Sequence, residues 1–401
     1  MENFVFYAPT KVYFGKETQK QVGEIIHGYG IHKVMIHFGG GSVKRSGLLD
    51  EVINSLREQG IDYILYGGVS PNPTLGFAET GKDICIRENV ELILAVGGGS
   101  VIDSAKCIAD WAGNPEKSSK EVWKYFQKEA LPQKALPVGV ILTLAASGSE
   151  MSASCVITNE EGWLKRGFNS DTHRPLFAIM NPELTYTVNP FQTACGIVDI
   201  MMHTLERYFC LNEGNELTDR LDEALLKTVI QSGREAMKKP NDYEARANLM
   251  WAGSWSHNDL TGTGRTYLMR VHQLEHEVSG MYPQIAHGAG LSALFCSWAR
   301  FVVKEVPERF AQYAIRVWDC EKDNADPLKV AYEGIDRTEA FFKELHMPIS
   351  LKELSVDPDT IEKMAEKCTF FGKRVLNDYI VLGKEEMIEI FKMAYNKSIE
   401  E

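Results

Sequence analysis

The sequence predicts an α/β part followed by an all-helical part, and three observations indicate this. Short apolar runs alternate with helical segments as far as Met180, which is typical of βαβ units and a parallel sheet with flanking helices. Two of these runs lead directly into the same Gly-Gly-Gly-Ser tetrapeptide. From Pro190 onward apolar residues recur at helical spacing, and no strand alternation reappears. We therefore expect an α/β domain over residues 1–188 and an all-helical domain over residues 189–401.

The strands expected in the first part are apolar runs that end at glycine, proline or asparagine. The helices between them carry an apolar face at helical spacing, as residues 48–59 do with Leu48, Leu49, Val52, Ile53 and Leu56. We expect strands at residues 33–38, 61–69, 91–96, 137–144, 151–158 and 176–180, and helices at residues 17–28, 48–59, 77–88 and 101–111.

The second part opens with a well-signalled helix. Asn189 is a favourable N-cap, Pro190 suits the first helical position, and Gln192 stands where a capping box places a side chain that reaches back. Further helices are expected at residues 217–238, 243–257, 267–279, 288–306, 308–318, 330–345, 360–371 and 384–396.

Composition excludes several classes of protein. The formal net charge of -12 argues against a protein that binds the nucleic-acid backbone, which needs clustered Lys and Arg. The longest apolar run, residues 135–146, is too short to span a membrane, and the N-terminus lacks the features of a signal peptide. The eight cysteines are scattered without a C-x-x-C pair, so we expect reduced thiols and a cytoplasmic location.

Both glycine clusters follow an apolar run and precede a helix, an arrangement that presents backbone N–H groups to an anion. Gly97, Gly98, Gly99 and Ser100 are the main candidates for the pyrophosphate of a dinucleotide, although a tight turn without a ligand gives the same pattern. The cluster is neither G-x-G-x-x-G nor a G-x-x-x-x-G-K-[ST] phosphate loop.

The earlier cluster bears on the choice of cofactor. Dinucleotide sites for NAD commonly hold the ribose hydroxyls with an acidic residue at the end of a neighbouring strand. Here that position holds the small, uncharged residues Gly39, Gly40, Gly41 and Ser42. Lys44 and Arg45 follow shortly after them. This favours NADP(H) over NAD(H), although Lys44 and Arg45 could also be a solvated helix start. Residues 143–150 could donate hydrogen bonds to a phosphate or a carboxamide, or form a simple turn.

Histidines and one aspartate in the second part suggest a metal site. Asp199 and His203 are four residues apart and therefore share one face of the first helix. His272, His276 and His287 follow downstream. One carboxylate with three imidazoles suits a divalent ion such as Fe2+ or Zn2+. Any single histidine could instead be an ordinary hydrogen-bonded residue, so the spacing alone is weak.

Taken together, these motifs resemble the iron-containing (group III) alcohol dehydrogenase family, over essentially the whole chain. The resemblance is closest to the NADP(H)-dependent branch of butanol dehydrogenases and aldehyde reductases. It lies in residues 71–73, 97–106, 143–150, 196–206 and 272–288. It implies metal ligands at Asp199, His203, His272 and His287, and a proton-relay role for His276. It implies cofactor contacts at Gly39, Gly40, Gly41, Ser42, Asn72, Gly97, Gly98, Gly99, Ser100, Asp103, Thr143, Ser147, Gly148, Ser149 and Lys165.

The expected reaction is reversible hydride transfer between NADP(H) and a small primary alcohol or aldehyde, with the ion as a Lewis acid. We expect a homodimer with no nucleic-acid or membrane partner. Three alternatives were weighed. A polyol dehydrogenase or dehydroquinate synthase-like lyase would need more basic residues than Arg265 and Arg270 near the histidines. A zinc hydrolase fails because Gly280 breaks the H-E-x-x-H pattern begun at His276. A non-catalytic nucleotide or metal sensor remains open.

Overall fold

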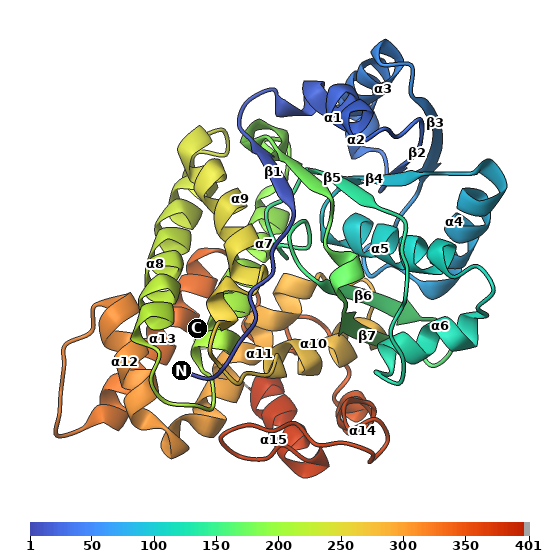
Figure 1. Cartoon of the computed structure of the whole chain (residues 1–401). Coiled ribbons are helices and arrows are strands. Elements are labelled where there is room, and N and C mark those ends of the chain that lie inside the picture. The colour runs from blue at the N-terminus through green and yellow to red at the C-terminus, as the bar shows by residue number, and fades with distance from the viewer. Residues whose placement is uncertain (397–401) are drawn as a thin grey trace. The chain divides into compact units, whose positions relative to one another are not determined.

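The structure is a computed structural model that describes residues 1–396, and the chain forms two compact units (Figure 1). The sheet unit comprises residues 7–188 and 241–258, and the helical unit comprises residues 1–6, 189–240 and the chain from residue 259 onward. The break after Val188 falls at the expected boundary. Residues 241–258, which the sequence places in the helical domain, cluster instead with the sheet unit.

The sheet unit is built on six parallel strands. The sequence predicts the parallel sheet and five of these strands but not the one at residues 11–14, and its expected strand at residues 151–158 lies in an antiparallel hairpin instead. The order of the six strands is β1-β8-β5-β4-β2-β3, and every pairing between neighbours is parallel. The central strands β4, β5 and β8 are buried along their whole length, which is typical of a parallel sheet covered on both faces. The strands are β1 (Lys11–Phe14), β2 (Lys33–Phe38), β3 (Asp62–Gly67), β4 (Leu92–Gly97), β5 (Val138–Leu142) and β8 (Phe177–Met180).

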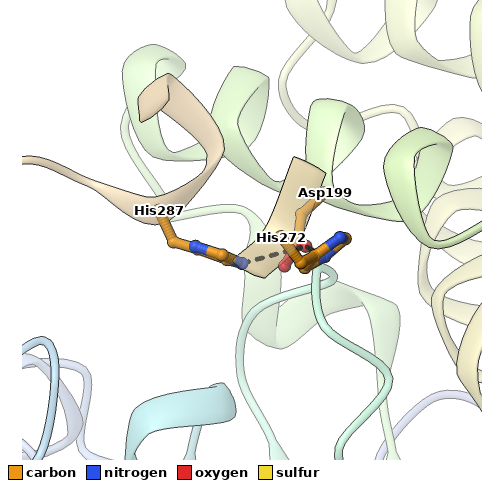
Figure 2. Close-up of side chains that lie close together, drawn as sticks. All are labelled: Asp199, His272 and His287. Carbon is orange, nitrogen blue, oxygen red and sulfur yellow. Dashed lines mark ion pairs between the residues drawn. The ribbon is translucent and has the colours of Figure 1, made fainter. Parts of the chain in front are cut away.

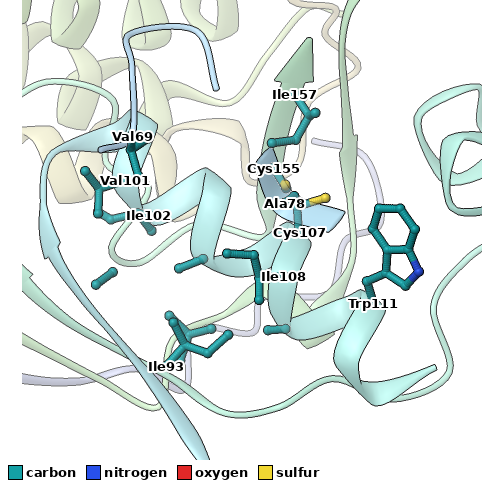
Figure 3. Packing of buried hydrophobic residues seen from close by; sticks show 14 of the residues in the cluster. Val69, Ala78, Ile93, Val101, Ile102, Cys107, Ile108, Trp111, Cys155 and Ile157 are labelled. Carbon is teal, nitrogen blue, oxygen red and sulfur yellow. The ribbon is translucent and has the colours of Figure 1, made fainter. Parts of the chain in front are cut away.

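Successive residues of these strands point to opposite faces and so feed two cores. In β4, Ile93 packs in a cluster with helices α4, α5 and α6, part of which Figure 3 shows. Leu92 and Leu94 pack in a second cluster with α1 and α3. The helices of this part are α1 (Val22–Gly28), α2 (Ser42–Arg45), α3 (Leu48–Glu58), α4 (Leu75–Glu88), α5 (Gly99–Gly113) and α6 (Ser119–Phe126), with short 3-10 turns η1 (Thr18–Gln21), η2 (Asp171–His173) and η3 (Pro182–Thr185).

A two-stranded antiparallel hairpin, β6 (Ser154–Asn159) and β7 (Leu164–Asn169), accompanies the sheet. The sequence predicts β6 but not β7. The strand β7 reads Leu-Lys-Arg-Gly-Phe-Asn, which has no apolar run. Its Phe168 is nevertheless buried in the core with α6, so tertiary packing overrides the local pattern.

Helix α9 (Tyr243–His257) has the predicted bounds but belongs to the sheet unit. Its Met250 lies in the core cluster of that unit, and the hydroxyl of Ser254 donates to Oε1 of Glu150 over 2.5 Å. Gly148 has φ of +66°, and a Cβ there would lie 2.4 Å from the backbone oxygen of Gly253. Close packing of α9 on the turn at residues 147–150 therefore explains why this helix leaves the expected domain.

The helical unit contains no β-strand within the described residues, only an isolated bridge between Leu376 and Leu382. The predicted cap of its first helix is present, since Oδ1 of Asn189 accepts from the backbone N–H of Gln192. None of the described helices is long and apolar enough to cross a membrane. The helices are α7 (Pro190–Tyr208), α8 (Glu216–Lys238), α10 (Arg270–Met281), α11 (His287–Val302), α12 (Pro307–Trp318), α13 (Pro327–Glu344), α14 (Ile361–Cys368) and α15 (Lys384–Tyr395), with 3-10 turns η4 (Leu260–Gly262), η5 (Val303–Glu305) and η6 (Pro358–Thr360).

Candidate functional site

Three of the predicted metal ligands converge in the helical unit. Asp199 on α7, His272 on α10 and His287 at the start of α11 place their ligand atoms within 4.8 Å of one another (Figure 2). Nε2 of His272 lies 3.6 Å from Oδ1 of Asp199, and Nε2 of His287 lies 3.9 Å from the same oxygen. The start of α11 can pack this closely on α7 only because residue 288 is glycine. A Cβ on Gly288 would lie 2.3 Å from the backbone oxygen of Cys195 on α7.

The chemistry of these atoms fits a divalent cation. Oδ1 of Asp199 and Nε2 of His272 are buried, and neither makes a hydrogen bond within the part of the chain that the structure describes. Buried polar atoms without partners cost stability, and a cation held between them would satisfy both. One carboxylate oxygen with imidazole nitrogens is a donor set that suits Fe2+ or Zn2+.

His203 lies beside this group of three but is not part of it. Its Nδ1 is 2.9 Å from the backbone oxygen of Asp199 and 3.2 Å from Oδ1 of that residue. Because a carbonyl oxygen only accepts, Nδ1 carries the proton and Nε2 keeps its lone pair. The ring centroid of His203 is 4.4 Å from that of His272. A metal-ligand role for His203 stays a prediction. The tautomer with a lone pair on Nε2 is the one that such a role requires.

His276, the predicted proton-relay residue, stands one helical turn after His272 and is half-buried. Its ring centroid lies 5.7 Å from that of His287, and its nitrogen joins a second close group with Glu275 and His287. This places a partly exposed imidazole next to the candidate metal ligands, where it can exchange a proton with solvent.

The ligands carry shifted pKa values. Burial would raise the pKa of Asp199, but the nearby imidazoles, first that of His203, hold it well below its usual range. Burial lowers the pKa of His203 to about 4. For His272, burial lowers the pKa, but the charge of Glu206 and further acidic contacts outweigh it and raise the pKa to about 9. The carboxylate of Asp199 therefore stays ionised at neutral pH, which favours a cation beside it.

The glycine cluster at residues 97–100 has the predicted strand-turn-helix form. Strand β4 ends at Gly97, and α5 begins at Gly99 without a side-chain cap. The chain is buried as far as Gly97 and becomes partly exposed at Gly98, Gly99 and Ser100. A Cβ on Gly99 would lie 2.4 Å from Oγ of Ser147, so this position has no room for a side chain. Such a turn suits the close approach of a phosphate to the backbone.

Other predicted cofactor residues gather at the same edge of the sheet. The backbone N–H of Thr143 donates to the oxygen of Gly97 over 3.1 Å, which joins the ends of β5 and β4. The neighbouring strand β2 ends at Phe38 and leads into residues 39–42. Ligands of open α/β sheets bind at such carboxyl ends. A Cβ on Gly41 would lie 2.4 Å from Nη1 of Arg45, so this guanidinium lies over the turn.

Four predicted cofactor residues make contacts within the protein or lie in a loop. The hydroxyl of Ser149 donates to Oδ1 of Asp103 over 2.6 Å, and the backbone N–H of Val156 donates to Oδ2 of Asp103 over 3.1 Å. Asp103 thus ties residues 149–156 to α5. Lys165 is buried in β7, opposite Thr158. Asn72 lies in the loop after β3 with φ of +56°. Direct cofactor contact by these residues stays a prediction.

Comparison with known proteins decides the family. Residues 9–182 match the domain family described as iron-containing alcohol dehydrogenase, and residues 193–395 match the C-terminal domain of the same family. The chain belongs to the iron-containing alcohol dehydrogenase family. This confirms the resemblance drawn from the motifs.

Individual relatives of this alcohol dehydrogenase cover nearly the whole chain. The NADH-dependent butanol dehydrogenase A of Clostridium acetobutylicum is 40% identical, over 98% of this chain and 100% of that protein. The NADPH-dependent aldehyde reductase YqhD of Escherichia coli is 34% identical, over 94% of this chain and 96% of that protein. The crystal structure of a butanol dehydrogenase A from Thermotoga maritima superposes with a TM-score of 0.93, at 35% identity and covering 99% of each chain.

Family membership supports an oxidoreductase that acts on alcohols or aldehydes and uses a nicotinamide cofactor and a divalent metal. The relatives do not decide between NADH and NADPH, because their names differ in this respect.

Two residues of the candidate site have no role in the sequence-based prediction. Glu206 and Glu275 are completely buried, and they accept hydrogen bonds from Nδ1 of His272 and Nδ1 of His287 respectively. A signal for both exists in the sequence, since Glu206 follows His203 by three residues and Glu275 follows His272 by three. Residues at this spacing share a helix face.

Proposed function

We propose that this enzyme interconverts a small primary alcohol and its aldehyde with NADP(H), using a divalent ion held by Asp199, His203, His272 and His287. The observation that carries the proposal is the convergence of the ligand atoms of Asp199, His272 and His287 within 4.8 Å, where two buried polar atoms make no hydrogen bond to any described residue. An ion bound there would supply Lewis-acid polarisation, and a nicotinamide would supply or accept the hydride.

The test is a spectrophotometric assay of NADPH oxidation with a series of linear aldehydes, before and after removal of metal by a chelator. We expect oxidation that the chelator abolishes and that added Fe2+ or Zn2+ restores. If the protein bound NADPH but oxidised none of it with butanal and either ion, a sensor function would replace the proposal.

Preference for NADP(H) is supported by the neutral turn at residues 39–42 and by the exposed cations Lys44 and Arg45. We expect Arg45→Ala to lower kcat/KM for NADPH, relative to that for NADH, by about 10- to 100-fold, because a charge-assisted hydrogen bond contributes about 1.5–3 kcal/mol. Steady-state kinetics with both cofactors measures the ratio. Arg57→Ala, another exposed arginine, is the control. A wild-type enzyme with the higher kcat/KM for NADH would contradict the preference.

The proposed role of His276 is to exchange a proton between the reacting oxygen and solvent, which its partial exposure beside His287 supports. We expect His276→Ala to lower kcat by about 10²- to 10⁴-fold, the usual contribution of general acid–base catalysis, and to flatten the pH profile of kcat. His27→Ala, an exposed histidine of α1, is the control. An unchanged kcat and pH profile would mean that His276 serves only packing.

A further inference from the structure

Glu206 on α7 binds the start of α10. Its Oε1 accepts from the backbone N–H of Val271 over 2.6 Å, and its Oε2 accepts from the backbone N–H of His272 over 3.1 Å. These donors belong to the first turn of α10, whose own preceding residue, Met269, provides no side-chain cap. Glu206 therefore caps α10 from a neighbouring helix and fixes the position of His272.

The same carboxylate also sets the tautomer of His272. Its Oε2 contacts Nδ1 of His272, and a carboxylate can only accept, so the imidazole proton lies on Nδ1. In the neutral ring, the form that binds a metal ion, Nε2 then carries the lone pair, and this atom is the one that lies 3.6 Å from Oδ1 of Asp199. One buried side chain thus determines both where the ring of His272 lies and which of its nitrogens can bind an ion.

Glu275 does the same for His287. Its Oε2 accepts from Nδ1 of His287, which leaves Nε2 directed toward Asp199 at 3.9 Å. Gly290 leaves space for the side chain of Glu275, since a Cβ on this glycine would lie 2.7 Å from Cγ of Glu275. Each of these two imidazoles is therefore hydrogen-bonded through Nδ1 to its own fully buried carboxylate.

We propose that Glu206 and Glu275 are positioning residues that set the affinity of this site for its divalent cation. The inference rests on the proposed function. Hydrogen bonds from carboxylates orient the rings of His272 and His287 and make their Nε2 atoms stronger donors. Together with Asp199 they also bring three acidic groups to the site, which favours a divalent cation over a proton or a monovalent ion.

The test replaces each carboxylate by its neutral isostere, Glu206→Gln and Glu275→Gln. The dissociation constant for Zn2+ is measured on metal-free protein by competition with a chelating dye, and the melting temperature of the metal-free protein is measured in parallel. We expect both variants to bind Zn2+ about 10- to 100-fold more weakly, the usual effect of losing such a partner. Because Glu206 also caps α10, its variant should have the lower melting temperature of the two.

Glu277→Gln is the matched control. Glu277 is equally buried on α10, and its Oε2 lies 3.8 Å from Nζ of Lys367. We expect this variant to bind Zn2+ as the wild type does. Dissociation constants within about twofold of wild type in both test variants would overturn the inference, as would an equal loss of affinity in the control. These outcomes are distinct from failure of the proposed function, in which the wild type itself would bind no Zn2+ or Fe2+.

Discussion

Asp199→Asn should abolish most of the activity by removing the ion. An amide keeps the shape of the side chain but not the negative charge that His203, His272 and His287 surround. Lewis-acid stabilisation amounts to several kcal/mol, so we expect kcat/KM to fall roughly 10³-fold or more. Metal analysis of the purified variant should show little bound Fe2+ or Zn2+, whichever of the two ions the wild type carries.

The matched control is Asp222→Asn in the same helical unit. Asp222 is also buried, but its partner is Arg265 and not a histidine. This variant should lose stability, because the buried Arg265 keeps only Asp219 of its two carboxylate partners, yet keep its metal. If Asp199→Asn retained both bound metal and kcat/KM, the carboxylate would not be a ligand and the proposed centre would be wrong.

Local signals in the sequence predict individual helices, strands and turns, together with the helix face that carries the site. The cap at Asn189 and the i,i+4 spacing of Asp199 and His203 predict α7 and the face that carries the site. The run into Gly97 predicts a buried strand that ends at a helix start, and the structure confirms the parallel sheet around it.

Contacts between distant segments could not be predicted in this way. Spacing along the chain does not show that α10 and α11 bring their histidines to Asp199. The residue types only suggested a metal site, and the resemblance to a family supplied the set of ligands. Helix α9 has the same periodicity as its neighbours, so nothing local shows that its Ser254 binds Glu150 in the sheet unit. The family resemblance implies a cofactor contact for Asp103, yet its carboxylate accepts hydrogen bonds from Ser149 and Val156.

The contacts of Lys106 provide the prediction with the largest expected effect on stability. Lys106 on α5 is fully buried, and its Nζ donates to the backbone oxygens of Ser149, Ser152 and Ser154 over 2.8, 3.1 and 2.8 Å. It also donates to the hydroxyl of Ser149, which in turn donates to Asp103. One ammonium thus holds the segment that follows the turn at residues 147–150 against α5.

Lys106→Met keeps the aliphatic stem but leaves three buried carbonyl oxygens and the carboxylate of Asp103 without a cation. Removing one member of a buried charged network costs about 3–5 kcal/mol, so we expect a loss of that size in the free energy of unfolding of the sheet unit. Urea unfolding measures it, and Lys124→Met, at an exposed position of α6, should change it by less than about 0.5 kcal/mol. The double variant Lys106→Met, Asp103→Asn should recover part of the loss, because the unpaired charge is then gone as well. If Lys106→Met were as stable as Lys124→Met, the network would not hold this segment, and the position of Ser147 over Gly99 would need another explanation.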